Sequence, residues 1–197
     1  MILVYTILAA FLVGLILGKF TIPILHALKA GQSIREIGPK WHNTKAGTPT
    51  MGGVIFIGAS LLCLVTGWKE LVQGNRDFLY VLLVSLAFGL IGFADDYVKV
   101  RKKRDLGLSA IQKLVLQLAV SGLYLYMLYQ NGNLTQELYI PFFQITWTVN
   151  PLIYGIFAMF VMVGCVNAVN LTDGIDGLAA GVTIPVMIFF IVIATLW

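Results

Sequence analysis

The sequence predicts an all-α polytopic membrane protein with about six transmembrane helices and one short hairpin between two of them. Of the 197 residues, 59% are hydrophobic and only 11% are charged, whereas about a quarter of the residues in a soluble domain are charged. Six apolar runs cause this imbalance, and each is close to the roughly 20 residues that a helix needs to cross a bilayer. They cover residues 2–28, 51–67, 78–94, 109–130, 151–169 and 178–197, and we expect a single transmembrane domain over residues 1–197.

The first run is a membrane helix rather than a cleaved signal peptide, because it lacks a basic start and its apolar stretch is too long. Two later runs contain the cysteines, Cys63 and Cys165. A disulfide would require both cysteines to lie at the same depth in the membrane, and antiparallel spans do not readily place them there. We therefore expect both to be buried small apolar residues without redox chemistry.

Lysine and arginine are distributed unevenly among the connecting segments. Loop 29–50 contains Lys29, Arg35, Lys40 and Lys45, and loop 95–108 contains Lys99, Arg101, Lys102, Lys103 and Arg104. Segment 131–150 contains no basic residue. The positive-inside rule places the two basic loops in the cytoplasm. Alternation of the spans then puts the N-terminus outside and the connection between the fifth and sixth runs inside.

Segment 131–150 reads NGNLTQELYIPFFQITWTVN and joins the fourth and fifth runs. It contains strand-forming residues around Pro141 and a loose alternation of polar and apolar positions. These features favour a short hairpin at the membrane interface, with Tyr139 and Trp147 as anchors.

The first unusual cytoplasmic segment is GPKWHNTKAGTPTMGG, residues 38–53. One interpretation is a loop that simply breaks before a helix. The other is a phosphate or nucleotide contact, in which Lys45 supplies charge and Thr48 and Thr50 supply hydroxyl groups. It is not a Walker loop, because G-x-x-x-x-G-K-[ST] is absent.

The second segment contains adjacent carboxylates, Asp95 and Asp96, at the cytoplasmic end of the third run. A structural interpretation pairs them with Lys99 or Arg101. A functional interpretation uses them near Mg²⁺, which prefers hard oxygen ligands and keeps substrate phosphates in its shell. Lys113 lies inside the next apolar run, where an ammonium group is costly and therefore a candidate for function.

The third segment is NAVNLTDGIDGLAAG, residues 167–181. Its polar residues Asn167, Asn170, Asp173 and Asp176 follow one another at three-residue steps. On a helix, this spacing covers about half of one face, so all four could meet a single ligand. The alternative is helix capping, with Asp173 or Asp176 as the N-cap of the sixth span, which explains only one of the four.

Four motifs resemble the phospho-N-acetylmuramoyl-pentapeptide-transferase family of bacteria. They are GTPTMGG at 47–53, FADDYVK at 93–99, GLSAIQK at 107–113 and NAVNLTDGIDGLAAG at 167–181. GTPTMGG is the most specific, whereas the aspartate motifs are shared with the wider superfamily of polyprenyl-phosphate N-acetylhexosamine-1-phosphate transferases. The resemblance implies Mg²⁺-dependent transfer of phospho-MurNAc-pentapeptide from UDP-MurNAc-pentapeptide to undecaprenyl phosphate, giving lipid I and UMP for peptidoglycan synthesis.

The resemblance also implies a role for each matching residue. Asp95 would meet the lipid phosphate as a base or charge-positioning group, and Asp96 would shape the same catalytic site. Asp176 would lie near Mg²⁺. The implied substrate-binding residues are Lys45, Thr48, Lys99 and Lys113 for phosphates, and Asn167, Asn170 and Asp173 for the nucleotide-sugar side.

The family has ten spans, so we expect this chain to be an N-terminal portion that is inactive alone. The resemblance implies the bacterial inner membrane, with a periplasmic hairpin, a cytoplasmic active site and a homodimer. The lipid bilayer is an expected partner and nucleic acid is not. Three alternatives stay open: a polyprenyl-phosphate GlcNAc-1-phosphate transferase, a transporter or proton channel, and a non-catalytic membrane segment.

Overall fold

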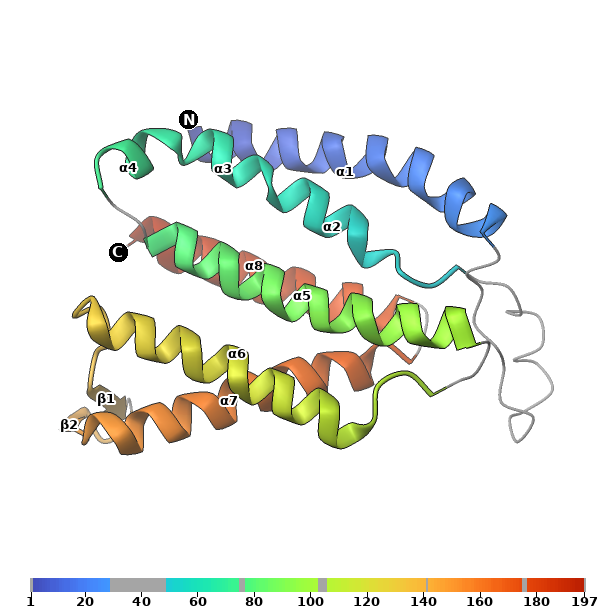
Figure 1. The fold of residues 1–197 in the computed structure, drawn as a ribbon. Coiled ribbons are helices and arrows are strands. Elements are labelled where there is room, and N and C mark those ends of the chain that lie inside the picture. Colours follow the sequence, from blue (N-terminus) through green and yellow to red (C-terminus); the bar gives the residue numbers. More distant parts are fainter. Residues whose placement is uncertain are drawn as a thin grey trace. The chain divides into compact units, whose positions relative to one another are not determined.

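The computed structural model describes residues 2–28, 49–74, 77–102, 106–140, 142–174 and 177–196. Within these residues, five helices are long and apolar enough to cross a membrane. They are α1 (Ile2–Ala27), α5 (Asp77–Lys102), α6 (Ala110–Gln130), α7 (Pro151–Thr172) and α8 (Leu178–Leu196), labelled in Figure 1. The prediction of an all-α polytopic membrane protein is confirmed.

The second apolar run differs from the single helix that the sequence predicted. It forms two short helices, α2 (Gly53–Ser60) and α3 (Leu62–Thr66), which are followed by α4 (Trp68–Val72). The hydroxyl of Ser60 donates to the carbonyl of Phe56 at 2.8 Å, and that of Thr66 donates to the carbonyl of Leu62 at 3.4 Å. Hydroxyl groups bonded one turn back bend helices, and both lie where a helix of this run ends.

The chain divides into two compact units, residues 1–120 and residues 121–197. In the first unit, α2 packs against α1 through Gly58, because a Cβ atom at this glycine would lie 2.7 Å from Cδ1 of Leu17. α2 also meets α5, where a Cβ atom at Gly89 would lie 3.1 Å from Cδ1 of Ile57. Small residues allow membrane helices to approach each other closely in this way.

The second unit contains the end of α6, a hairpin, α7 and α8. Strands β1 (Glu137–Ile140) and β2 (Ile145–Thr148) pair antiparallel, with Leu138 opposite Trp147. The predicted hairpin is therefore present. The side chain of Asn150 caps α7 by accepting a hydrogen bond from the N–H of Leu152 at 2.9 Å, and Pro151 occupies the first helical position.

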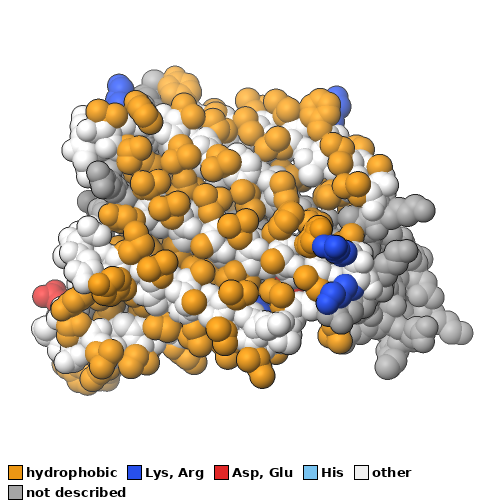
Figure 2. Space-filling model, viewed as in Figure 1, with side chains coloured by type: hydrophobic (Ala, Val, Ile, Leu, Met, Phe, Trp, Pro, Cys, Tyr) orange, Lys and Arg blue, Asp and Glu red, His pale blue; other side chains and the backbone are white. Residues whose placement is uncertain are grey.

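Apolar side chains are exposed along all five long helices, as expected for surfaces that face lipid. Examples are Phe11, Leu90, Leu123, Phe160 and Phe189, and Figure 2 shows hydrophobic side chains over most of the face that it presents. The thiol of Cys165 belongs to this exposed surface and is free, so the prediction of a buried Cys165 was wrong. A small, weakly polar side chain can face lipid as readily as protein.

Candidate functional site

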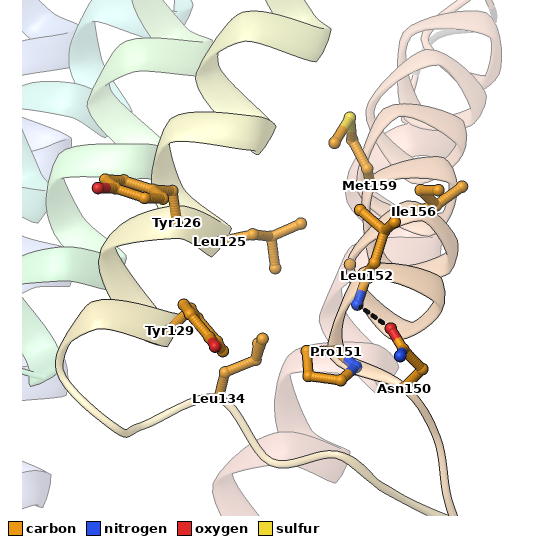
Figure 3. Close-up of a pocket in the computed structure, with 10 residues that line it drawn as sticks. Leu125, Tyr126, Tyr129, Leu134, Asn150, Pro151, Leu152, Ile156 and Met159 are labelled. Atoms are coloured by element: carbon orange, nitrogen blue, oxygen red, sulfur yellow. Dashed lines mark hydrogen bonds between the residues drawn. The ribbon is translucent and has the colours of Figure 1, made fainter.

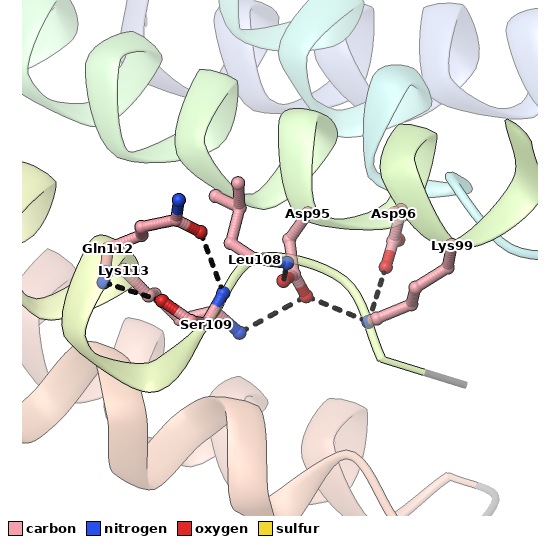
Figure 4. A network of polar contacts seen from close by, with 7 residues as sticks. All are labelled: Asp95, Asp96, Lys99, Leu108, Ser109, Gln112 and Lys113. Atoms are coloured by element: carbon pink, nitrogen blue, oxygen red, sulfur yellow. Dashed lines mark hydrogen bonds and ion pairs between the residues drawn. The ribbon is translucent and has the colours of Figure 1, made fainter. Parts of the chain in front are cut away.

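Asp95, near the end of α5, is the centre of a charged cluster in the first unit. Only 4% of the residue is exposed. Its Oδ2 atom lies 2.8 Å from Nζ of Lys99 and 3.1 Å from Nζ of Lys113. Its other oxygen, Oδ1, accepts a hydrogen bond from the backbone N–H of Leu108 at 2.9 Å. Figure 4 shows these contacts converging on one carboxylate.

Helical spacing explains the part of the cluster that α5 contributes. Lys99 follows Asp95 by one turn and Asp96 by three residues, and side chains at these spacings meet on a helix surface. Its Nζ atom lies 2.9 Å from Oδ1 of Asp96, so one ammonium group bridges both carboxylates. The structural interpretation, which pairs the two aspartates with Lys99 or Arg101, is thus borne out for Lys99.

The start of α6 brings Lys113 to the cluster. The N–H of Gln112 donates to the hydroxyl of Ser109 at 3.2 Å, and the N–H of Ser109 donates to the side-chain oxygen of Gln112 at 3.0 Å. This reciprocal pair is a capping box, which defines where a helix begins. It fixes Lys113 in the first turn of α6, directly after the loop that supplies the N–H of Leu108.

Gly107 lets this loop lie directly against Asp95. A Cβ atom at Gly107 would overlap the carboxylate of Asp95 and lie 2.6 Å from its backbone oxygen. Any larger residue must therefore push the loop away from α5. The contributions of Gly107, the N–H of Leu108 and Gln112 were not predicted, although the S-x-x-Q pattern in GLSAIQK is a recognisable signal for the cap.

The charges of the cluster balance, since two carboxylates face two ammonium groups. The side chain of Asp95 is only 6% exposed, whereas those of Lys99, Asp96 and Lys113 are 33%, 32% and 24% exposed. The lysines therefore cover the carboxylate of Asp95 and are themselves accessible. Such ammonium groups can exchange a carboxylate partner for a phosphate oxygen.

The second unit holds three other predicted site residues, at the end of α7. The amide of Asn167 donates to the carbonyl of Val163 at 2.8 Å, while Asn170 and Asp173 are exposed. Asp173 is the C-cap of α7, and its N–H donates to the carbonyl of Val169 at 3.1 Å. The alternative in which Asp173 caps the start of the next helix is therefore wrong.

The predicted single helical face over residues 167–176 is also wrong. α7 ends at Thr172 and α8 begins at Leu178, after Gly177 with a φ angle of 78°. Two glycines beside the aspartates favour this break, because glycine readily leaves the helical conformation. Asn167 and Asn170 are helical, while Asp173 lies at the turn.

The described residues do not form a metal site by themselves. Among them, no three histidine, cysteine, aspartate or glutamate side chains group closely enough to hold an ion. The oxygens of Asp95 already face two ammonium groups and an N–H group. Three predicted site residues lie outside the described ranges: Lys45, Thr48 and Asp176.

Known proteins resemble this chain along its whole length. The model of glycosyl transferase family 4 matches residues 78–196, and phospho-N-acetylmuramoyl-pentapeptide-transferase signature 1 matches residues 45–57. The phospho-N-acetylmuramoyl-pentapeptide-transferase of Clostridium acetobutylicum is 43% identical over 196 residues, which are 100% of this chain and 60% of that protein.

The proteins of the same name from Heliobacterium modesticaldum and Bacillus subtilis are 47% and 41% identical. Their matches cover 98% and 91% of this chain, and 59% and 55% of those proteins. The chain thus spans somewhat more than half the length of the curated relatives that it matches.

Proposed function

The chain belongs to glycosyl transferase family 4, and we propose that it forms part of a phospho-N-acetylmuramoyl-pentapeptide-transferase. The proposed reaction joins phospho-MurNAc-pentapeptide to undecaprenyl phosphate and releases UMP from UDP-MurNAc-pentapeptide, giving lipid I. The match of signature 1 to residues 45–57 carries this proposal. It covers GTPTMGG, the motif that distinguishes this activity from other transfers of a sugar phosphate to a polyprenyl phosphate.

The chemistry exchanges one phosphoanhydride bond for another. The phosphate oxygen of the lipid attacks the β-phosphorus of the nucleotide substrate, and the bond from that phosphorus to the UMP oxygen breaks. A phosphate monoester has its second pKa near about 6, so at cytosolic pH the acceptor is already largely a dianion. Little proton transfer is then needed, and the main obstacle is the repulsion between two anions.

Lys99 and Lys113 are placed to reduce this repulsion. In the structure, both ammonium groups are held within 3.1 Å of one carboxylate oxygen, with Lys99 at 2.8 Å and Lys113 at 3.1 Å. We propose that the arriving phosphate takes over part of these contacts, while Asp95 keeps the two lysines oriented. Charge-assisted hydrogen bonds from ordered donors position the reacting oxygens and screen their charge.

Mg²⁺ would neutralise charge on the pyrophosphate and on the departing UMP. The described residues do not provide an ion site on their own, and the proposed ligand Asp176 lies outside them. We therefore assign no step to the metal and keep Asp176 as its proposed ligand. Lys45 and Thr48 remain proposed phosphate contacts, and Asn167, Asn170 and Asp173 remain proposed contacts of the nucleotide-sugar.

The proposed location is the bacterial inner membrane, with the N-terminus outside and the active site on the cytoplasmic side. Arg101 and Lys102 end α5 six residues beyond Asp95 and Asp96, and basic residues at a span's end favour the cytoplasm. The same alternation of spans supports placing the end of α7 on that side. A homodimer remains a proposal from the family resemblance.

The alternative enzyme would transfer GlcNAc-1-phosphate, and a single assay separates the two. This chain would be joined to the segment of the Clostridium acetobutylicum relative that it does not match, which gives the extended chain. The extended chain in membranes should release UMP from UDP-MurNAc-pentapeptide only when undecaprenyl phosphate is present. UMP release from UDP-GlcNAc instead would identify the other transferase. Release from neither substrate, with the folded protein present, would contradict the proposal.

A further inference from the structure

The hairpin formed by β1 and β2 has one apolar and one polar face. Side chains of cross-strand partners lie on the same face, and neighbouring positions alternate. The register pairs Leu138 with Trp147 and Ile140 with Ile145, so these four share one face. The opposite face carries Glu137 paired with Thr148, and Tyr139 paired with Thr146.

The tip of the hairpin carries two adjacent phenyl rings. Phe142 is 96% exposed and Phe143 is 73% exposed. Gln144 ends the turn with a φ angle of 52°, a left-handed conformation that is common where a hairpin loop rejoins its strand. Two adjacent exposed aromatic side chains at a turn indicate contact with something apolar.

The hairpin is tied closely to two membrane-crossing helices. α7 begins at Pro151, and only Val149 and Asn150 separate it from β2. The segments that precede β1 and follow β2 line an apolar pocket of about 460 Å³ between the end of α6 and the start of α7, shown in Figure 3. Its lining includes Leu125, Tyr129, Leu134, Asn150, Ile156 and Met159.

The apolar surface continues from the hairpin into the first turns of α7, where Leu152, Ile153 and Ile156 are exposed. Between Lys113 and Asp173, the sequence contains one charged side chain, that of Glu137. It lies on the polar face of the hairpin. An isolated two-stranded hairpin is marginally stable in water. The apolar face of this hairpin must therefore pack against another apolar surface.

We propose that this hairpin is an interfacial membrane anchor that binds the phospholipid surface. Its apolar face and the rings of Phe142 and Phe143 lie in the boundary between head groups and acyl chains, in the leaflet where α6 ends. Its polar face, with Thr146 and Thr148, points to water. Tyr139 lies on this face, so in the proposed arrangement Trp147 acts as an anchor and Tyr139 does not. Trp147 suits this boundary, because Trp is enriched at membrane interfaces. The tip phenylalanines suit it as well, since Phe is common on the apolar face of interfacial segments.

Neighbouring positions on opposite faces provide a matched test. A spin label would be attached to the chain at Phe142→Cys, Ile145→Cys or Thr146→Cys, in a background of Cys63→Ala and Cys165→Ala. The protein would be studied in nanodiscs of phosphatidylethanolamine and phosphatidylglycerol. Collisions of each label with oxygen, which partitions into lipid, would be compared with collisions with a water-soluble nickel chelate.

The expected result is a several-fold higher ratio of oxygen to nickel collisions at positions 142 and 145 than at position 146. High nickel access at all three positions would show that the hairpin stands away from the bilayer, which overturns the proposal. Shielding from both reagents at 142 and 145 would show a protein occupant, such as a second copy, and would also overturn it. Position 142 can be read alone if the label at 145 unfolds the hairpin, because Phe142 is 96% exposed.

Discussion

Nζ of Lys113 lies 3.1 Å from Oδ2 of Asp95, although the two residues are 18 positions apart in the sequence. The contact joins the end of α5 to the first turn of α6, across a loop that also donates the N–H of Leu108 to the same carboxylate. Contacts with two ammonium groups and one backbone N–H group hold this buried carboxylate in one orientation. This arrangement supports the proposed role of Asp95, which is to keep the two lysines oriented toward the substrate phosphates.

Replacing Asp95 by Asn in the extended chain should lower turnover by about 10²-fold or more, the cost that a misplacement of reacting groups by about 1 Å can carry. The neutral amide cannot hold both lysines in place for the phosphates. UMP release with saturating substrates measures the effect, and thermal unfolding checks that the variant folds. Near-normal turnover would rule out the assignment of Asp95.

Lys113→Met should reduce kcat/KM for undecaprenyl phosphate, because a hydrogen bond to a charged group contributes about 1.5–3 kcal/mol, or roughly 10- to 100-fold. Lys102→Met is the matched control, since it removes the same charge from an exposed position at the end of α5. Equal losses in both variants would indicate that only the overall positive charge matters. The comparison requires kinetics at several concentrations of the lipid acceptor.

Gly107→Ala should destabilise the protein by about 1–3 kcal/mol, the usual cost of overpacking. The added Cβ atom would lie 2.6 Å from the backbone oxygen of Asp95, so the loop must move and the hydrogen bond from Leu108 must lengthen. Gly92→Ala is the control, because a Cβ atom there would meet nothing within 4 Å. In nanodiscs, the midpoint temperature of thermal unfolding of the Gly107→Ala variant should be well below that of the Gly92→Ala variant. Equal midpoint temperatures would contradict the packing described.

Asp173→Asn should separate stability from function. A carboxylate at the C-cap of α7 opposes the helix dipole, so its neutralisation should stabilise the helix by about 0.3–1 kcal/mol at low salt. If Asp173 binds the nucleotide-sugar, the same variant of the extended chain should show a higher KM for UDP-MurNAc-pentapeptide. An unchanged KM would remove Asp173 from the proposed binding residues.

Asp176→Asn should raise the Mg²⁺ concentration required for half-maximal activity of the extended chain, because it removes a hard oxygen ligand. Titration of activity with Mg²⁺ at saturating substrates measures this shift, and chelation of the metal should abolish turnover in both proteins. Asp173→Asn provides a neighbouring control for the loss of one negative charge. An identical Mg²⁺ titration of the Asp176→Asn and unaltered proteins would argue against a metal role.

Composition and apolar run length were sufficient to predict the long helices, because a membrane span depends mainly on local hydrophobicity. The hairpin could also be predicted from the strand-forming residues around Pro141. The break in the second run was missed, because hydropathy is averaged over the run and does not locate an interruption of one residue at Leu61.

The cluster was only partly predictable. Pairing of Asp95 with Lys99 follows from helical spacing, and the sequence suggested it. The contact with Lys113 depends on how closely the loop containing Gly107 approaches α5, which spacing along the chain does not determine. The break after Thr172 likewise depends on two helix ends, and three-residue periodicity alone suggested a continuous helix there.

The scarcity of charge around the hairpin also affects how the protein enters the membrane during synthesis. Glu137 is the one charged residue between Lys113 and Asp173, so the part of α6 beyond Lys113, the hairpin and α7 contain no basic residue that would retain the hairpin on the side of synthesis. In the proposed orientation, the chain from α6 to α7 would carry a single acidic group, that of Glu137, across the membrane. Adding a lysine to the turn would be expected to impede that transfer.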